Sequence, residues 1–416
     1  MTDDTLARAK ALGQIPRGFS AIDGVLAISD QAVTALVEQA GSTPLFIYSA
    51  RMLADRVGRL RAALPREISI HYAVKANPYN DVLRAFSGLV DGFDIASGGE
   101  LGIVRAAGID PGLVSFAGPG KRDAELAAAI AAGVTINLES EAEAERAIGI
   151  AAAAGVLPRL AVRVNPDFDL KGSGMKMGGG AKPFGVDAER VPDLVRRVVR
   201  SGAEWRGFHI FAGSQALSAD ALIETQALTL DLAARLARES GAPLPHLNLG
   251  GGFGIPYFPG EQPLDVEQVG AALSRKLADR PAELADTRLC IELGRWLVGE
   301  AGVYLTRITD RKDSGGQTFL VTDGGLHHML AASGNFGQVL RRNYPVAIAG
   351  RFGSEPDEDV TVTGCLCTPL DLLADEVSLP HAEPGDVVAI FCAGAYGLSA
   401  SPQSFLSHPA AREMLV

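Results

Sequence analysis

The sequence predicts an α/β protein made of a (β/α)8 barrel followed by a second, β-rich domain. With 416 residues, the chain is too long for one small core. Between residues 70 and 293, short apolar segments alternate with helical segments rich in Ala, Leu and Arg, and there are eight such units, the number that a closed barrel requires. After Glu300 the helical segments give way to short strands separated by Gly, Asp and Pro. An open, doubly wound sheet is the alternative, but the unit count and the placement of polar residues favour the barrel.

Three segments divide the chain on this basis. Residues 1–44 are expected to form a lead-in that packs with the β-rich domain, residues 45–296 the barrel and residues 297–416 the β-rich domain. The lead-in contains an amphipathic segment, Asp30–Gln39. A strand at Leu45–Tyr48 and a helix at Ala50–Leu64 follow it.

The expected barrel strands are Ile70–Lys75, Gly92–Ala96, Leu113–Ala117, Thr135–Leu138, Leu160–Val164, Gly207–Ala212, Leu247–Gly250 and Leu289–Leu293. The clearest helices between them are Asp123–Ala132, Glu141–Ala154 and Ala219–Arg238. The expected strands of the β-rich domain are Tyr304–Thr309, Thr318–Asp323, Val346–Arg351, Asp359–Gly364 and Asp386–Ala393.

Composition excludes several classes of partner. The formal net charge of -11 argues against nucleic acid or an anionic membrane as a standing partner. No apolar run approaches the ~20 residues of a membrane helix, and the first residues lack the pattern of a secretory signal. The cysteines are few and do not resemble a disulfide framework; they are Cys290, Cys365, Cys367 and Cys392. We therefore expect a soluble, cytoplasmic protein.

Lys75 is the first candidate for chemistry. It stands at the carboxyl end of a β-branched, aromatic strand, before Ala-Asn-Pro. An amine held among apolar neighbours has a lowered pKa and can attack a carbonyl. The structural alternative is an edge-strand lysine with its ammonium group in water.

Other polar residues also stand at strand ends, where barrels place their working groups. Asp94, Arg163 and Ser214 belong to this set, together with the glycine loop Gly250–Gly254. The Ser214 hydroxyl and the backbone N–H groups of the loop offer donors to an anion, since no Cβ intervenes. Beside a strand-end lysine they indicate a phosphorylated cofactor, although three glycines alone usually mark a turn.

Glu292, after the eighth strand, suggests which cofactor. A carboxylate opposite a pyridine nitrogen keeps that nitrogen protonated, which makes pyridoxal phosphate a strong electron sink. The structural alternative for Glu292 is an ion pair with Arg295, three residues further on.

Seven motifs in order resemble those of the fold-type III pyridoxal-phosphate decarboxylases, which include the diaminopimelate and ornithine decarboxylases. The motifs are Tyr72–Asn77, Gly92–Ser97, Gly213–Gln215, Gly250–Gly254, Glu292-x-Gly294-Arg295, Cys367-x-x-x-Asp371 and Gly394–Gly397. The resemblance runs from about Pro44 to the end of the chain. It implies an alanine-racemase-like barrel with a C-terminal β-domain, and a homodimer with shared active sites.

The resemblance also implies roles for single residues. Lys75 would bond to the cofactor aldehyde, Glu292 would pair with the ring nitrogen, and Cys367 would reach in from the other subunit to deliver a proton. The thiol is also a titratable donor on chemical grounds.

The phosphate or its surroundings would be held by Ser214, Gly250, Gly251, Gly252, Arg295 and Tyr396. Further cofactor contacts are expected at Asp94, Arg163, His209, Phe211 and Gly294, and substrate contacts at Arg295, Asn335, Thr368 and Asp371. No metal is expected, because Cys290 and Cys392 show no zinc-like spacing relative to Cys365 and Cys367.

The chain departs from the family pattern at two places. Phe211 stands where the family usually has a second histidine, and it can stack on a ring but cannot titrate. His209, on an apolar strand, is more typical of a core residue than of a catalyst. The Arg-Pro-x-x-Tyr segment with which diaminopimelate decarboxylases grip the far end of their substrate is missing after Asp323-Gly324-Gly325.

This variant resembles a side branch of the family, which includes decarboxylases of amino acids tethered to an acyl carrier protein and decarboxylases of exosortase and exopolysaccharide gene clusters. A tethered aminoacyl thioester has no free charge at its far end. This agrees with the absence of the Arg-Pro-x-x-Tyr segment, which would bind such a charge. Arg341 and Arg342 would then meet an acidic carrier, unless they are a solvated surface pair. The segment Gly172–Gly185 is either a mobile cover or a long loop.

The expected reaction is decarboxylation of an α-amino acid, free or carrier-tethered, to an amine and carbon dioxide. Diaminopimelate decarboxylation in lysine biosynthesis is the nearest alternative. An amino acid racemase on the same barrel would place arginine against the ring nitrogen, so Glu292 speaks against it. A non-catalytic cofactor-binding protein would typically have lost the lysine or the cysteine, and this chain keeps both.

Overall fold

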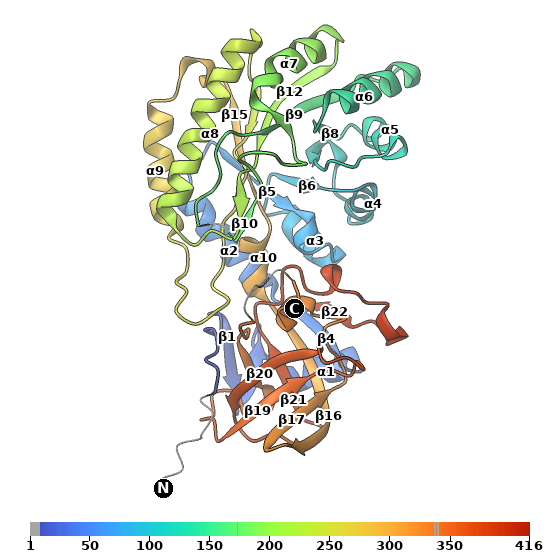
Figure 1. Cartoon of the computed structure of the whole chain (residues 1–416), viewed down its shortest axis with the longest axis vertical. Coiled ribbons are helices and arrows are strands. Elements are labelled where there is room, and N and C mark those ends of the chain that lie inside the picture. The colour runs from blue at the N-terminus through green and yellow to red at the C-terminus, as the bar shows by residue number, and fades with distance from the viewer. Residues whose placement is uncertain (1–8, 173, 337, 339–340) are drawn as a thin grey trace. The chain divides into compact units, whose positions relative to one another are not determined.

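The computed structural model describes residues 9–172, 174–336, 338 and 341–416. The chain divides into two compact units (Figure 1). The barrel unit consists of Ala54–Ile255 and Pro263–Leu297, and the β-rich unit of Met1–Leu53, Pro256–Gln262 and Val298–Val416.

Eight parallel strands close the barrel, and this confirms the predicted fold class. They are β5 (Ile68–Ala73), β6 (Gly92–Ile95), β7 (Val114–Phe116), β8 (Thr135–Leu138), β9 (Arg159–Asn165), β12 (Glu204–Ile210), β14 (His246–Asn248) and β15 (Arg288–Leu293). The ring closes because β15 pairs with β5 on one side and β8 pairs with β9 on the other. A short strand, β11 (Val186–Asp187), adds to β9.

Helices lie on the outer side of these strands (Figure 1). They are α2 (Ala50–Ala63), α3 (Asn80–Ser87), α4 (Gly98–Ala106), α5 (Asp123–Ala132), α6 (Glu141–Ala154), α7 (Val191–Arg200), α8 (Ala219–Ser240) and α9 (Val266–Ala278), and the short α10 (Arg295–Val298) follows β15. Their ends follow from local chemistry. Ser140 and Ser218 cap α6 and α8 by accepting a backbone N–H of the first turn, and Gly155 and Gly241 end the same helices in the left-handed region. Among the described residues, no helix is long and apolar enough to cross a bilayer.

The β-rich unit is built around the long strand β16 (Gly302–Ser314), which pairs with three neighbours. The strands of its main sheet are β4 (Leu45–Tyr48), β16, β17 (Gln317–Thr322), β18 (Val346–Ile348), β19 (Glu358–Thr363), β20 (Leu372–Leu379), β21 (Val387–Ile390) and β22 (Arg412–Leu415). Because β4 pairs with both β16 and β22, it belongs to this sheet, although the expected barrel segment begins at residue 45.

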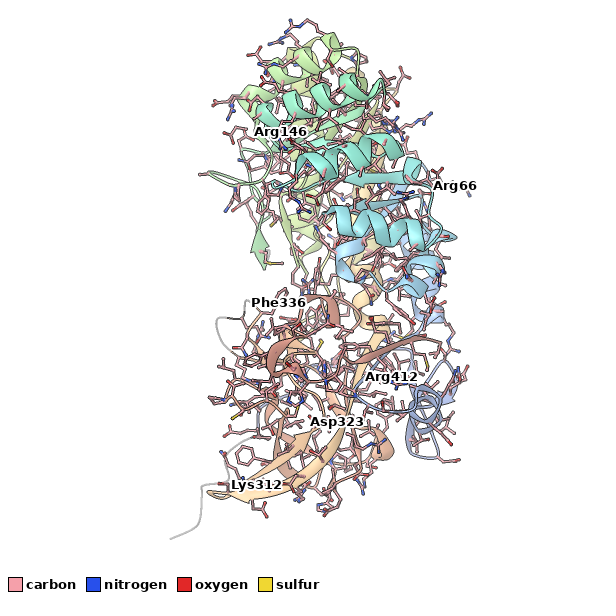
Figure 2. The ribbon with its side chains drawn as sticks, turned by 90° about the vertical axis from the view of Figure 1, so that its right-hand side faces the viewer. Arg66, Arg146, Lys312, Asp323, Phe336 and Arg412 are labelled. Carbon is pink, nitrogen blue, oxygen red and sulfur yellow. The ribbon has the colours of Figure 1, made fainter. Side chains whose placement is uncertain are left out.

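The lead-in packs into the same core. It forms β1 (Phe19–Ile22), β2 (Val25–Ile28), β3 (Gln31–Ala32) and α1 (Val33–Ala40). Leu26 and Leu36 from these elements share a buried cluster with Val303 of β16 and Phe391 after β21. Asp323, labelled in Figure 2, links the lead-in to β16 because its carboxylate accepts hydrogen bonds from the hydroxyls of Thr43 and Thr306.

Candidate active site

Lys75 lies on a 3-10 turn, Val74–Ala76, that follows β5. Val74 and Ala76 are buried on either side of it, whereas the Lys75 side chain is 44% exposed. Asn77 stabilises the turn: its backbone oxygen accepts the Tyr72 hydroxyl at 3.0 Å, and its side-chain oxygen accepts the Tyr79 N–H at 3.0 Å. The backbone is therefore held firmly while the amine remains accessible.

Glu292 faces the same space as Lys75. Its side chain, on β15, is only 6% exposed, and its Oε1 lies 3.6 Å from the Lys75 Nζ. Its Oε2 lies 3.0 Å from the Nε2 of His209, on β12. Burial acts to raise the pKa of Glu292, but Lys75, His209 and Arg163 outweigh it and hold the pKa well below its usual range. The structure thus brings together an amine and an ionised carboxylate that are far apart in the sequence.

His209 and Phe211 line the region beside this pair. The Phe211 ring centroid is 5.6 Å from the Lys75 Nζ, and the rings of His209 and Phe211 are 6.5 Å apart in an edge-on arrangement. His209 is buried, as a core residue would be. It also lies directly against the Glu292 carboxylate.

The glycine loop after β14 packs against the backbone around Glu292. A Cβ at Gly251 would lie 1.9 Å from the Glu292 carbonyl oxygen, and one at Gly252 would lie 2.5 Å from the Gly213 oxygen. The Gly250 oxygen accepts the Glu292 N–H at 2.9 Å. Ser214 follows Gly213 on β13 (Gly213–Ser214). Only glycine fits this approach, so the loop forms a backbone cradle beside the carboxylate.

Gly294 allows β15 to pack closely against the turn that contains Lys75, as the glycine loop does for the backbone around Glu292. A Cβ at this position would lie 2.7 Å from the Ala76 Cβ. Arg295, the next residue, begins α10 and is half-buried. The motif Glu292-x-Gly294-Arg295 therefore packs directly against the turn that presents Lys75.

Arg163 belongs to a buried network that the sequence analysis missed in part. Its Nη1 lies 2.8 Å from the Oε1 of Glu139, and both side chains are less than a tenth exposed. Glu139 also accepts the backbone N–H of Gly118 at 2.6 Å and of Gly185 at 2.8 Å. Glu139 directly follows β8, so inspecting the end of every strand would have identified it. Nearby, Lys121 and Glu143 form a second buried pair at 2.7 Å.

Asp94 lies on β6 with a buried side chain. It accepts a hydrogen bond from the Ser115 hydroxyl, and its Oδ2 lies 3.4 Å from the Nδ1 of His71. Asn137 extends this network by donating to the Ser115 oxygen at 3.0 Å. His71, Ser115 and Asn137 also line a cavity of about 250 Å³ inside the barrel. A direct contact of Asp94 with the cofactor stays a prediction.

The remaining expected site residues lie in the β-rich unit. Cys367 is exposed, on the loop between β19 and β20. Asp371 is only 2% exposed and accepts the N–H groups of Leu326 at 2.6 Å and Leu366 at 2.8 Å. Asp371 therefore fixes the backbone of the Cys367 loop, and a substrate contact by it stays a prediction.

Asn335, Thr368 and Tyr396 belong to segments around that loop. The Asn335 amide donates to the Leu370 oxygen at 3.3 Å, and Thr368 donates its N–H to the Leu366 oxygen at 2.8 Å. Tyr396 has a positive φ of 53°. These contacts order the loop, and the expected substrate and phosphate roles of the three residues remain predictions.

Arg341 and Arg342 both have partners within the β-rich unit. Arg341 donates to the Leu372 carbonyl oxygen. Arg342 lies 3.2 Å from a Glu261 oxygen, and its guanidinium stands 3.7 Å over the Phe258 ring. They do not form a freely solvated pair, and contact with a carrier protein stays a prediction.

The segment Gly172–Gly185 is anchored at two points in the barrel unit. Its β10 (Met175–Lys176) pairs with β13, with Met175 opposite Ser214, and its last residue donates to Glu139. Ser173 lies outside the described residues. Pairing with the strand that contains Ser214 places this segment beside the candidate cradle.

Comparisons with known proteins agree with this geometry. Residues 51–299 match the family model described as "Pyridoxal-dependent decarboxylase, pyridoxal binding domain". The L-glutamyl-[BtrI acyl-carrier protein] decarboxylase of Niallia circulans is 36% identical over 93% of this chain and 91% of its own length. The diaminopimelate decarboxylase of Methanothermobacter thermautotrophicus is 33% identical over 94% and 91%. The crystal structure of the diaminopimelate decarboxylase of M. jannaschii with L-lysine aligns with a TM-score of 0.86 at 25% identity, covering 96% of this chain and 93% of that one.

Proposed function

Since the chain belongs to the family of pyridoxal-dependent decarboxylases, we propose that Lys75 and Glu292 hold opposite ends of one pyridoxal phosphate molecule. The protein is a pyridoxal-phosphate-dependent amino acid decarboxylase. By their names, its relatives act on a carrier-bound amino acid in one case and on diaminopimelate in another.

One observation supports the residue assignment above all others: the Lys75 amine and the buried Glu292 carboxylate face the same space, 3.6 Å apart, and the Lys75 side chain, 44% exposed, would swing outward to admit the cofactor ring between them. The bound cofactor supplies an electron sink for the electron pair that remains when the substrate loses carbon dioxide. Lys75 provides the amine for the cofactor aldehyde. Glu292, kept ionised by its surroundings, holds a proton on the ring nitrogen. His209 orients Glu292, and Phe211 offers an apolar face to the ring.

The phosphate group would lie on the cradle formed by Ser214 and the glycine loop. A Cβ at Gly251 or Gly252 would collide with the backbone oxygen of Glu292 or Gly213, so only glycine lets the loop pack this closely and bring its backbone N–H groups beside Ser214, where they could approach an anion. Arg163, held by Glu139, adds a buried positive charge to the same unit. The residues present therefore fit the cofactor at its aldehyde, its ring nitrogen and its phosphate.

Cys367 is proposed to return a proton to the carbon that loses the carboxylate. Its thiol is exposed on an ordered loop, and the neighbouring apolar side chains Phe336 (labelled in Figure 2) and Leu370 are 43% and 57% exposed. Exposed apolar side chains around a functional group are typical of an interface. They support a homodimer in which Cys367 of the partner subunit completes each site.

The proposed substrate is an α-amino acid attached to an acyl carrier protein through its side-chain carboxyl, because the α-carboxylate must stay free to leave as carbon dioxide. The chain lacks the Arg-Pro-x-x-Tyr grip after Gly325, and a thioester-linked amino acid has no free charge at that end to be gripped. The Niallia circulans relative, by its name, acts on a glutamyl group linked to a carrier protein.

Release of carbon dioxide from matched free and tethered substrates tests this proposal. Purified protein with pyridoxal phosphate would receive free L-glutamate, free diaminopimelate, and L-glutamate linked through its side-chain carboxyl to pantetheine or to an acyl carrier protein. We expect the carrier-bound substrate to react fastest and the Lys75→Ala variant to release none. Equal rates with the pantetheine thioester would mean that the thioester, and not the carrier surface, is recognised. Faster release from free diaminopimelate would refute the tethered substrate and favour the lysine-biosynthetic reaction.

A further inference from the structure

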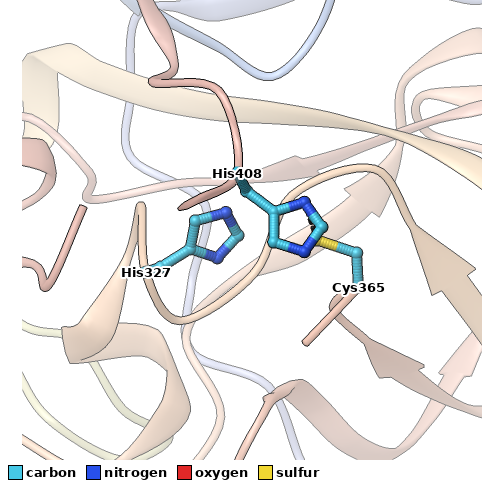
Figure 3. A group of neighbouring side chains, drawn as sticks. All are labelled: His327, Cys365 and His408. Carbon is cyan, nitrogen blue, oxygen red and sulfur yellow. Dashed lines mark hydrogen bonds between the residues drawn. The ribbon is translucent and has the colours of Figure 1, made fainter. Parts of the chain in front are cut away.

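The β-rich unit contains a cluster of metal-binding side chains that the decarboxylase chemistry does not use. His327, Cys365 and His408 each offer one ligand atom, and these atoms lie within 4.8 Å of one another (Figure 3). The residues come from three separate segments: the turn after β17, the loop after β19 and the stretch before β22. Spacing along the sequence cannot reveal such a cluster, because its members are about 40 residues apart.

His327 is the observation that points to a ligand. Its side chain is completely buried, and neither ring nitrogen has a hydrogen-bond partner among the described residues. Figure 3 shows its ring beside that of His408, and the two ring centroids are 5.3 Å apart. A buried imidazole without a partner loses its hydrogen bonds to water and gains nothing in return. A metal ion between the three side chains would satisfy it.

The surroundings of the cluster hold its members in place. The Cys365 sulfur lies 3.8 Å from the Nδ1 of His408. His328, next to His327, is fixed by the Tyr304 hydroxyl at 3.2 Å and by the Pro409 oxygen at 2.9 Å. The second contact ties the residue after His327 to the residue after His408.

We propose that His327, Cys365 and His408 bind one borderline-soft transition-metal ion, Zn²⁺ being the best match. Imidazole nitrogen and thiolate sulfur are the ligands that zinc prefers, at about 2.0–2.1 Å and about 2.3 Å, so that ligand atoms lie about 3.5 Å apart. Small side-chain rotations bring the three atoms from their present separation to this one. Cys365 binds as the thiolate and releases its proton to solvent. The ligand set has no carboxylate or carbonyl oxygen, which argues against Mg²⁺ or Ca²⁺.

Such an ion would join the C-terminal stretch to the loop that contains Cys367, two residues after Cys365. Three protein ligands leave a fourth position for water or another donor. This site is independent of the proposed cofactor assignment, because none of its ligands belongs to the barrel unit.

Metal binding by the untagged full-length protein tests the inference. After chelator treatment and dialysis against Zn²⁺ or Co²⁺, we expect one ion per chain by elemental analysis and, with Co²⁺, the visible absorption of a tetrahedral thiolate site. Cys365→Ser and His408→Asn should weaken binding at least ~10-fold. Cys367→Ser, two residues away, should bind as the wild type does and serves as the matched control.

Two further measurements keep the result interpretable. Circular dichroism of the metal-free variants checks folding, and His408→Asn, whose side chain is half-buried, is the variant least disturbing to the core. We expect Zn²⁺ to raise the melting temperature of the wild type and of Cys367→Ser but not of Cys365→Ser. Less than one ion per chain in the wild type, or equal binding by folded Cys365→Ser, would overturn the proposal.

Discussion

Replacing Glu139 by Gln should destabilise the barrel, because it removes the charge that balances buried Arg163. The Glu139 carboxylate accepts three hydrogen bonds, from the Arg163 guanidinium and from the N–H groups of Gly118 and Gly185. A glutamine keeps one acceptor oxygen but turns an NH2 group toward the remaining donors. Arg163 is then left buried and charged without its partner.

The size of the effect follows from burial. Removing one partner of a buried ion pair costs about 3–5 kcal/mol, and the oxygen that glutamine retains argues for the lower end. For a unit of this size, 1 kcal/mol corresponds to ~2–4 °C in melting temperature. We therefore expect the melting temperature to fall by about 6–12 °C at pH 7.

The effect should also depend on pH. Burial acts to raise the pKa of Glu139, but Arg163 and Lys121 outweigh it and lower the pKa below the ordinary 4.5. A lowered folded-state pKa means that the stabilisation is fully present above the unfolded-state value and is lost as pH falls through the folded-state value. The difference between wild type and Glu139→Gln should therefore shrink below about pH 4.5.

Thermal unfolding followed by circular dichroism measures these shifts. Glu141→Gln is the matched control, since its pair with Arg190 lies at the surface and should contribute about 0–1 kcal/mol. Adding Arg163→Met to Glu139→Gln should recover part of the loss, because the unpaired buried charge is removed. A melting temperature for Glu139→Gln within about 2 °C of wild type at pH 7 would refute this reasoning.

Three further variants test single roles in the site. Lys75→Ala should abolish carbon dioxide release, and borohydride should no longer fix the cofactor to the chain; retained turnover would contradict the assignment of the amine. Cys367→Ala should lower kcat by ~10²–10⁴-fold while cofactor content stays unchanged, and an unchanged kcat would show that another group supplies the proton. Gly251→Ala should weaken cofactor binding, because its Cβ would lie 1.9 Å from the Glu292 oxygen, whereas Gly102→Ala on an open helix surface should bind the cofactor normally.

Periodicity predicted the barrel well, because each strand is a short apolar run between helices with clear end signals. The expected limits of Thr135–Leu138, Asp123–Ala132 and Glu141–Ala154 are those of β8, α5 and α6. The strand at Lys75 ends two residues earlier than expected, since Val74–Ala76 turns into a 3-10 helix. That turn is made by the Asn77 contacts, which periodicity does not report.

The β-rich unit was harder to predict. Strand β20 interrupts its apolar residues with Asp375 and Glu376, and β22 is a short strand near the C-terminus, so neither has the alternation that marks a strand. The pairing of β4 with β16 and β22 joins segments more than 250 residues apart. Pairing over such distances follows from tertiary packing, not from local sequence.

In the candidate site too, some residues could be predicted from local sequence and others only from the folded chain. Strand-end positions pointed to Lys75 and Glu292, which the structure places 3.6 Å apart. Glu139 stands at a strand end too, but its role could not be predicted from the sequence, because it depends on the ion pair that Glu139 forms with Arg163 in the folded chain. The cluster around His327 depends wholly on the folded chain, because its three members are separated by long stretches of sequence.

The protonation state of the cofactor ring nitrogen tests the central claim most directly. Pyridoxal phosphate labelled with ¹⁵N at that nitrogen would be bound to the wild type and to Glu292→Gln, and its ¹⁵N chemical shift recorded. A carboxylate facing the ring from the side opposite Lys75 predicts a protonated nitrogen in the wild type and an unprotonated one in Glu292→Gln. The same shift in both proteins would contradict the claim that Lys75 and Glu292 hold the two ends of one cofactor.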